Sequence, residues 1–261
     1  DGLGYKASTQ VLSVPVTYTS LKNKDIDIYL GNWMPTQEAD RKPYVDDGSV
    51  EVIGPNLTGA KYTLAVPTYL YEAGLKNFAD IARFQKELGG KIYGIEPGND
   101  GNRLILGMIE KNQFGLKGFE VVESSEQGML AQVQRATARK EPVVFLGWAP
   151  HPMNTRYSIE YLSGGDDVFG PNFGGAEVFT NVRKGWVKEC PNAGHLIGNL
   201  KFNLNTENVV MDYILNEGME PEKAATKWLK ANPDVWAPWL DGVTTFSGEP
   251  GLPAVKASLG L

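Results

Sequence analysis

The sequence predicts an α/β fold, because short apolar runs alternate with amphipathic segments along most of its 261 residues. Strand-like apolar runs occupy residues 9–16, 26–31, 60–67, 91–96, 118–123 and 142–148. Segments with helical spacing lie between them, at residues 17–25, at 77–88, from 103 onward and at 124–140. Strands that alternate with helices of about ten to fifteen residues are typical of βαβ units, so we expect a largely parallel sheet.

The residue types at the ends of these segments predict where the helices begin. The helix from Arg103 follows the turn "PGNDGN" and carries Leu104, Ile105, Met108 and Ile109 on one face. The next helix is predicted to begin at a capping box formed by Ser124 and Gln127. Its buried face is predicted to continue through Leu130 and Val133. Two more helices are expected nearer the C-terminus, at residues 206–218 and 220–233.

Composition limits the classes of partner. The 25 basic and 31 acidic residues give a formal charge of -6, which argues against nucleic acid or an anionic membrane surface. No uninterrupted apolar run reaches the ~18 residues that span a bilayer. The chain begins "DGLGYK", which has neither the basic nor the apolar region of a signal peptide. We therefore expect that a signal peptide was either never present or has been removed.

The sequence offers little for catalysis. Its two histidines, His151 and His195, have no spacing suited to zinc, and a G-x-S-x-G nucleophile motif is missing. The glycines around "PGNDG" fit neither common nucleotide-binding motif. Asp166 and Asp167 are a weak signal for calcium, and a turn is the stronger interpretation. We expect no enzyme activity, no metal site and no cofactor.

Two of the six tryptophans stand at the ends of strand-like runs, Trp33 in "LGNWMPT" and Trp148 in "FLGWAP". In open α/β sheets ligands bind beyond the carboxyl ends of strands, so we expect both side chains to face a cleft. Asn99 has a similar place, after the run 91–96 and just before a helix. The other tryptophans are expected to pack in a core, and these are Trp186, Trp228, Trp236 and Trp239.

Aromatic rings around a cleft favour one class of ligand. A large ring in a loop needs either a core or a ligand to cover it. A quaternary ammonium group donates no N–H hydrogen bond, yet the faces of aromatic rings attract it. The two strand-end tryptophans therefore indicate a cleft for a quaternary ammonium compound.

Longer stretches carry a resemblance to a known family. The segments "LSVPVTYTSLKNKDIDIYLGNWMPT", "KIYGIEPGNDGNRLI", "LKGFEVVESSEQGMLAQV" and "YLSGGDDVFGPN" resemble the choline-binding periplasmic proteins of bacterial ABC importers. These belong to the wider glycine betaine/proline betaine/choline substrate-binding family. The resemblance implies a type II periplasmic binding protein fold, with two α/β lobes joined by two hinge crossings and the ligand cleft between them.

The same resemblance implies where the lobes and the site lie. One lobe would comprise residues 1–61 and 175–261, and the other residues 62–174. The aromatic box of the family falls on Trp33, Tyr62 and Trp148, and the polar residue that contacts the choline hydroxyl falls on Asn99. The hinges would lie near Tyr62 and near residues 174–182.

Family members also carry one more strand and helix, roughly 30 to 40 residues or about one βα unit, ahead of the part that matches this chain. That unit holds a further box tryptophan, an aspartate that faces the cation, and the disulfide partner of Cys190. Taken alone, Cys190 in "KECPNAG" would be a reduced structural residue. With the resemblance, we expect this chain to be a shortened form or a fragment.

These observations predict a monomeric periplasmic protein that captures choline, or a related quaternary ammonium compound, and delivers it to the permease subunits of an ABC importer. Glycine betaine or proline betaine is the alternative ligand. An enzyme acting on such an amine is a more distant alternative, and a structural protein would instead cover both strand-end tryptophans with its own chain.

Overall fold

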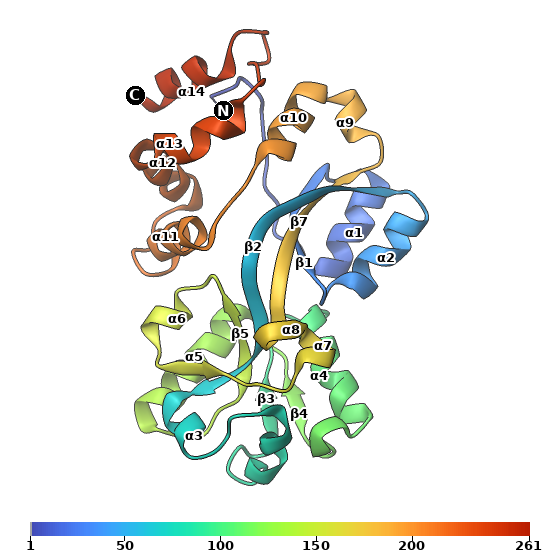
Figure 1. Ribbon diagram of the computed structural model, residues 1–261, viewed down its shortest axis with the longest axis vertical. Coiled ribbons are helices and arrows are strands. Elements are labelled where there is room, and N and C mark those ends of the chain that lie inside the picture. The colour runs from blue at the N-terminus through green and yellow to red at the C-terminus, as the bar shows by residue number, and fades with distance from the viewer. Residues whose placement is uncertain (1) are drawn as a thin grey trace.

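The structure, a computed structural model, describes residues 2–261 and has two lobes joined by two long strands (Figure 1). These strands are β2 (Val50–Pro67) and β7 (Gly175–Arg183), which pair with each other antiparallel. The remaining strands are β1 (Ile28–Met34), β3 (Lys91–Tyr93), β4 (Glu120–Val122), β5 (Phe145–Ala149) and β6 (Ile159–Tyr161).

The lower lobe in Figure 1 contains β3 to β6 and the largest apolar core, whose buried residues run from Tyr62 to Phe169. Its α-helices and 3₁₀ helices (η) are α3 (Thr68–Glu72), η1 (Phe78–Phe84), α4 (Asp100–Glu110), η2 (Gln113–Gly115), α5 (Glu126–Arg139), α6 (Met153–Arg156), α7 (Asp166–Phe169) and α8 (Pro171–Gly174).

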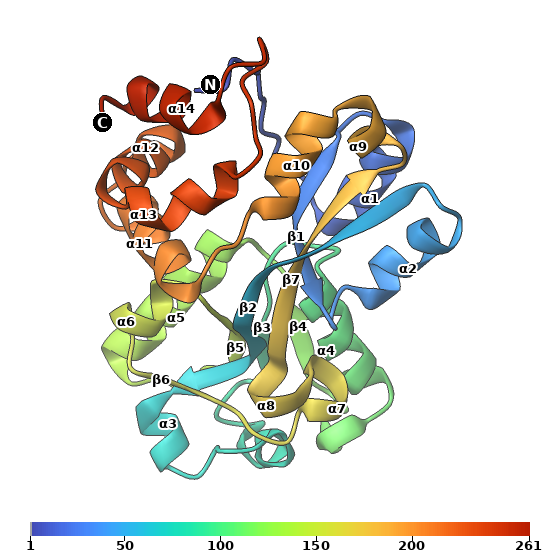
Figure 2. The ribbon, with the colours of Figure 1, turned by 45° about the horizontal axis from the view of Figure 1, so that its top comes forward.

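The upper lobe contains β1 and the N- and C-terminal helices, and Figure 2 shows α11 to α14 grouped away from α1 and α2. Its helices are α1 (Val14–Asn23), α2 (Glu38–Asp46), α9 (Trp186–Glu189), α10 (Pro191–Asn199), α11 (Leu204–Leu215), α12 (Pro221–Ala231), α13 (Pro233–Trp236), η3 (Ala237–Leu240) and α14 (Gly251–Leu259). Among the helices within residues 2–261, none is both long enough and apolar enough to cross a membrane.

The C-terminal helices enclose a core of their own. Trp228 and Trp236 are buried there, and Trp239 stacks on Trp228 with ring centroids 6.1 Å apart. Trp186 is also buried, at the start of α9. The expectation of buried residues is therefore confirmed for Trp186, Trp228 and Trp236, whereas Trp239 is partly buried and packs against the core. Cys190 follows α9 and is partly buried, and its expected disulfide remains a prediction.

The expectation of a largely parallel sheet is wrong. The sheet runs in the order β1-β7-β2-β5-β3-β4, with β6 also paired to β2. Only β3 pairs in parallel, with β4 and β5, whereas the pairings among β1, β2, β5, β6 and β7 are antiparallel. The sequence obscured this because β2 continues back to Val50 through Gly54, Pro55 and Gly59, where the register with β7 shifts. Such residues interrupt a strand pattern, although bulges accommodate them.

Residues 9–16 do not form the expected strand. Instead, α1 begins at Val14, with Pro15 in its first turn, and the segment before it pairs with no strand in the described part of the chain. A run of apolar and β-branched residues is a strand only where a neighbour supplies hydrogen bonds. Proline, by contrast, suits the first turn of a helix.

Three helix predictions need smaller corrections. Helix α4 begins three residues before Arg103, because Asn99 caps it. Ser125, not Ser124, caps α5, and its hydroxyl accepts a hydrogen bond from the Gly128 amide at 3.0 Å. The segment 77–88 forms a 3₁₀ helix over Phe78–Phe84 in place of an α-helix. The C-terminal helices α11 and α12 are confirmed within a few residues.

The turn into β7 depends on Gly174. Its φ of +69° lies in the left-handed region, and a Cβ placed on it would overlap the carbonyl oxygen of Tyr62. Lys61 and Gly175 are paired in the β2–β7 ladder, so this turn packs directly on the crossing strand. Only glycine allows the two backbones to come this close.

We expect Gly174→Ala to destabilise the protein far more than Gly218→Ala. Gly218 has almost the same φ, +68°, but no atom lies within 4 Å of the point that a Cβ would occupy there. Gly218→Ala is the control, and its free energy of unfolding should fall only by the cost of a left-handed alanine, about 1–2 kcal/mol. Gly174→Ala should lose that amount and, in addition, the cost of the backbone overlap. Urea unfolding of both variants measures the difference, and equal losses would contradict the packing argument.

Candidate ligand-binding site

A cavity of about 210 Å³ lies between the two lobes. It is smaller than the ~300–1,000 Å³ pockets that hold drug-sized ligands, so a small molecule fits it best. The residues that line it come from β1, β2 and β5, from the residue before α2, from the loop after β3 and from the start of α4. They are Tyr29, Gly31, Trp33, Gln37, Tyr62, Ile95, Asn99, Asp100 and Trp148.

All four residues singled out from the sequence line this one cavity, namely Trp33, Tyr62, Asn99 and Trp148. Trp33 is the last but one residue of β1, and Trp148 has the same place in β5. Tyr62 lies on the crossing strand β2 and is paired in register with Trp148. The structure thus brings the strand-end tryptophans together with the crossing strand, although their role in binding remains a prediction.

The three rings form adjoining walls. The Tyr62 ring lies between the two indoles, with centroids 6.1 Å from Trp33 and 6.3 Å from Trp148. The interplanar angles are 65° and 78°, so the rings meet edge to face and do not stack. Rings set at steep angles around a cavity can present several faces to one cation.

Tyr62 is held rigidly. Its side chain is buried, and its hydroxyl donates a hydrogen bond of 2.7 Å to Asn99 Oδ1. Burial raises the pKa of this hydroxyl well above its ordinary value, so the ring stays neutral. Gly101 lies directly against the ring, and any Cβ there would overlap the Tyr62 hydroxyl. The "NDG" sequence at the start of α4 therefore both caps the helix and leaves room for this ring.

The side-chain amide of Asn99 has its oxygen committed to the fold and an N–H group left for a ligand. Its Oδ1 accepts the Gly101 amide at 2.8 Å and the Tyr62 hydroxyl, as an N-cap residue does. Its Nδ2 donates a long bond of 3.3 Å to Asp100 Oδ1. The group that Asn99 can offer to a ligand is thus an N–H donor.

Behind Trp148, His151 acts as a structural support. The rings are 4.8 Å apart, and His151 Nδ1 accepts the Met153 amide at 3.0 Å. Its Nε2 lies 3.2 Å from Glu126 Oε1, which fixes the ring. The interpretation of this histidine as a structural residue agrees with these contacts.

Within residues 2–261, no group of three or more His, Cys, Asp or Glu residues could hold a metal ion. Asp166 and Asp167 are exposed residues in the first turn of α7.

Sequence reasoning missed Tyr29, Gln37 and Asp100. The Tyr29 hydroxyl donates to Gln37 Oε1 at 3.1 Å, which joins β1 to the residue before α2. Gln37 lies beyond the end of β1, and no local pattern marks it. Asp100 had a signal, since it follows the predicted residue Asn99 directly at a helix start.

An ion pair closes one edge between the lobes. The guanidinium of Arg103, in α4, binds both carboxylate oxygens of Asp40, in α2, at 3.0 and 2.7 Å. Arg103 Nη2 also lies 3.5 Å from the Thr36 carbonyl oxygen. A bidentate pair of this kind is a strong, directional contact. It connects the lobes beside the cavity wall.

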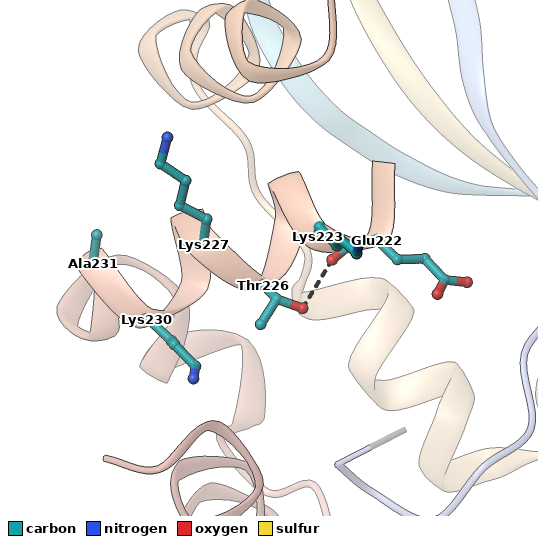
Figure 3. A pocket seen from close by; sticks show the side chains of 6 residues that line it. All are labelled: Glu222, Lys223, Thr226, Lys227, Lys230 and Ala231. Carbon is teal, nitrogen blue, oxygen red and sulfur yellow. Dashed lines mark hydrogen bonds between the residues drawn. The ribbon is translucent and has the colours of Figure 1, made fainter. Parts of the chain in front are cut away.

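A larger hollow, open to solvent, lies along α12 and is lined by exposed residues of that helix alone (Figure 3). Its lysine side chains point in different directions, and Lys227 pairs with Glu217 at 2.9 Å. Nothing converges on a common point there, so the cavity between the lobes is the candidate site.

Solved structures resemble the whole chain. An ABC-transporter choline binding protein in complex with choline is 64% identical, with a TM-score of 0.97 over 99% of this chain and 90% of the other. An ABC-transporter choline binding protein in an unliganded semi-closed conformation is 65% identical, with a TM-score of 0.90 over 100% and 90%. Lactococcal OpuAC, in its closed form with glycine betaine, is 27% identical with a TM-score of 0.81 over 90% and 88%. The expected two-lobed periplasmic binding protein fold is confirmed.

Sequence comparisons also point to substrate-binding proteins of transport systems. The glycine betaine/carnitine transport binding protein GbuC of Listeria monocytogenes is 31% identical over 169 residues, which are 63% of this chain and 55% of that protein. The uncharacterized protein ORF1 of Chromohalobacter salexigens is 46% identical over 104 residues, or 40% of this chain and 67% of that protein. Residues 1–231 match the family OpuAC, described as the substrate binding domain of ABC-type glycine betaine transport systems. This chain belongs to that family of substrate-binding domains.

Proposed function

We propose that this protein binds choline, or a closely related quaternary ammonium compound, in the cavity between its lobes and delivers it to the permease of an ABC importer. The observation that carries the proposal is the placement of Trp33, Tyr62 and Trp148 around one small cavity. Each cation–π contact is worth about 0.5–2 kcal/mol. Micromolar affinity needs about 8 kcal/mol, so three rings and the buried methyl groups supply much of it.

The charges of the cavity favour choline over glycine betaine. None of the described residues that line it is a lysine, arginine or histidine, so a betaine carboxylate has no cationic partner there. The Nδ2 group of Asn99 suits a neutral hydroxyl oxygen instead. The choline-bound structure with 64% identity supports this choice. Glycine betaine or proline betaine stands as the second candidate, favoured by the description of the family.

Binding is proposed to close the lobes about two hinges. The structure is more similar to the choline-bound relative than to the unliganded one, with TM-scores of 0.97 and 0.90. We place the division of the lobes at residues 62–174 against the rest. Lys61 and Gly175 are neighbours in the β2–β7 ladder, so both proposed crossings lie side by side. Two adjacent crossings permit a bending motion about one axis.

The cellular role follows from the family. We propose a monomer that works in the periplasm, meets permease subunits, and releases choline chemically unchanged. The part of the chain that the structure describes carries neither a metal cluster nor a nucleophile paired with a base in the cavity.

The aromatic box can be tested with tryptophan variants. We expect calorimetry with choline to give saturable binding that Trp33→Leu and Trp148→Leu each weaken by at least about tenfold, or about 1.4 kcal/mol. Leucine keeps apolar volume but offers no ring face, so Trp→Phe at the same positions should retain more affinity. Phe246→Ala is the control, because Phe246 is 75% exposed and does not line the cavity. Unchanged affinity in both leucine variants would rule out the box.

The choice of ligand can be tested by competition. Choline should displace glycine betaine at lower concentration than the reverse, because only the betaine buries a carboxylate without a cationic partner. Mass spectrometry of the recovered ligand should show unaltered choline. Tighter binding of glycine betaine would select the second candidate, and a new product would favour an enzyme.

The ion pair between the lobes should support closure. Arg103→Gln and Asp40→Asn are each expected to weaken choline binding by about two- to fivefold, since partly exposed ion pairs contribute up to about 1 kcal/mol. The double variant should lose no more choline affinity than either single variant, because each single substitution already removes the same ion pair. Arg135→Gln is the control, as Arg135 bonds to Gln132 within its own helix. Additive losses in the double variant would show that the residues act separately.

A further inference from the structure

Asp100 is a buried carboxylate in the wall of the cavity. Its side chain is 1% exposed, yet it is one of the residues that line the cavity. Its Oδ1 accepts a long bond from Asn99 Nδ2 at 3.3 Å, and hydrogen bonding to the Thr36 hydroxyl and to its own backbone amide works against the effect of burial on its pKa. Its Oδ2 has no hydrogen-bond partner among residues 2–261. A buried carboxylate left this incompletely bonded is costly, so a missing partner is indicated.

Among residues 2–261, the cation that acts on this carboxylate is already paired with another residue. Arg103 is the nearby cation, and it already binds both oxygens of Asp40. Burial raises the pKa of the Tyr29 and Tyr62 hydroxyls, so these neighbours are neutral. Of the nine residues that line the cavity, Asp100 alone can carry a charge at neutral pH.

We propose that Asp100 supplies the negative counter-charge for a cationic ligand and thereby makes the cavity prefer a cation to a zwitterion. This inference rests on the proposed function. The rings attract the ammonium through their quadrupoles, and the carboxylate adds a full charge from the wall formed by α4. A second carboxylate, carried by a betaine, would be repelled by the same group.

Asp100 also has an ordinary structural explanation, which the test must separate. It lies in the first turn of α4, where an acidic residue is stabilised by the helix N-terminus. Loss of that stabilisation would loosen the helix start and weaken all ligands alike. Loss of a counter-charge would weaken a cation selectively.

Calorimetry of Asp100→Asn with choline and glycine betaine distinguishes these roles. Asparagine keeps the size and removes the charge. We expect choline affinity to fall at least about tenfold. Glycine betaine affinity should change less than about threefold, because the lost attraction for its ammonium group is offset by the lost repulsion of its carboxylate. The control is Asp167→Asn, the same change at an exposed position of the same lobe, which should alter neither affinity. Equal losses for both ligands would overturn the counter-charge role.

The pH dependence gives a second measurement. Burial raises the pKa of Asp100, so its charge is lost as the pH falls through a value above the ordinary one for aspartate. Choline affinity of the wild type should then decrease toward acidic pH, and Asp100→Asn should lack that decrease. Asp40, Arg103, Tyr29 and Tyr62, which face Asp100 from the surrounding elements, are present in both proteins and so cancel in the comparison.

The two proposals fail in different ways. A wild-type protein that does not bind choline at any pH contradicts the proposed function itself. A wild type that binds choline, beside an Asp100→Asn variant with the same affinity and the same pH profile, contradicts the counter-charge alone. If glycine betaine binds to neither protein, the pH profile for choline decides. An Asp100→Asn variant that binds choline more weakly and without the pH dependence of the wild type supports the counter-charge. A variant that binds choline more weakly but keeps the wild-type pH dependence overturns it.

Discussion

The hydrogen bond from the Tyr62 hydroxyl to Asn99 Oδ1 is the contact on which the site depends. It joins the crossing strand β2 to the start of α4, and it fixes the ring that adjoins both tryptophans. The same oxygen caps the helix, so a change in the helix start would move the ring. Gly101 completes the arrangement because only a residue without a side chain allows the ring to lie there. A cavity wall and a helix cap are thus one structural unit, and its rigidity is what preorganises an aromatic box for a ligand.

The sequence was informative about this site where local pattern and position coincide. Trp33 and Trp148 follow apolar strands and precede prolines, and the carboxyl end of a strand already places a side chain at a cleft. Asn99 was recognisable because an asparagine before an amphipathic helix is either a cap or a site residue, and here it lines the site as well as capping the helix. Tyr62 came from family resemblance, since nothing in "AKYTLA" distinguishes a site tyrosine from a core one. The family itself was recognisable because the resemblance extends over most of the chain.

What the sequence could not predict depends on pairing over long distances. The direction in which β2 pairs with β7 is decided by residues more than a hundred positions apart, and the glycines and the proline within β2 hide its length. The segment 9–16 has the composition of a strand and lacks a neighbouring strand in the described structure, so composition alone misled. Gln37 and Tyr29 reach the cavity only because the chain turns back after β1. Asp100 is different. The sequence shows that it follows Asn99 at a helix start, but only the structure shows that it is buried and that its Oδ2 lacks a hydrogen-bond partner among the described residues.

The division of the cavity between two lobes makes affinity and closure inseparable. Trp33 and Gln37 belong to the upper lobe, whereas Asn99, Asp100 and Trp148 belong to the lower one, and Tyr62 lies on the strand between them. A ligand in the open protein would meet only part of the box, so the remaining contacts are gained only when the lobes close. The apparent affinity then equals the affinity of the closed state reduced by the fraction of closed molecules. Contacts between the lobes that do not line the cavity, such as Arg103 with Asp40, therefore also change binding. A transport protein benefits from this coupling, because any partner that pulls the lobes apart must also weaken the hold on the ligand.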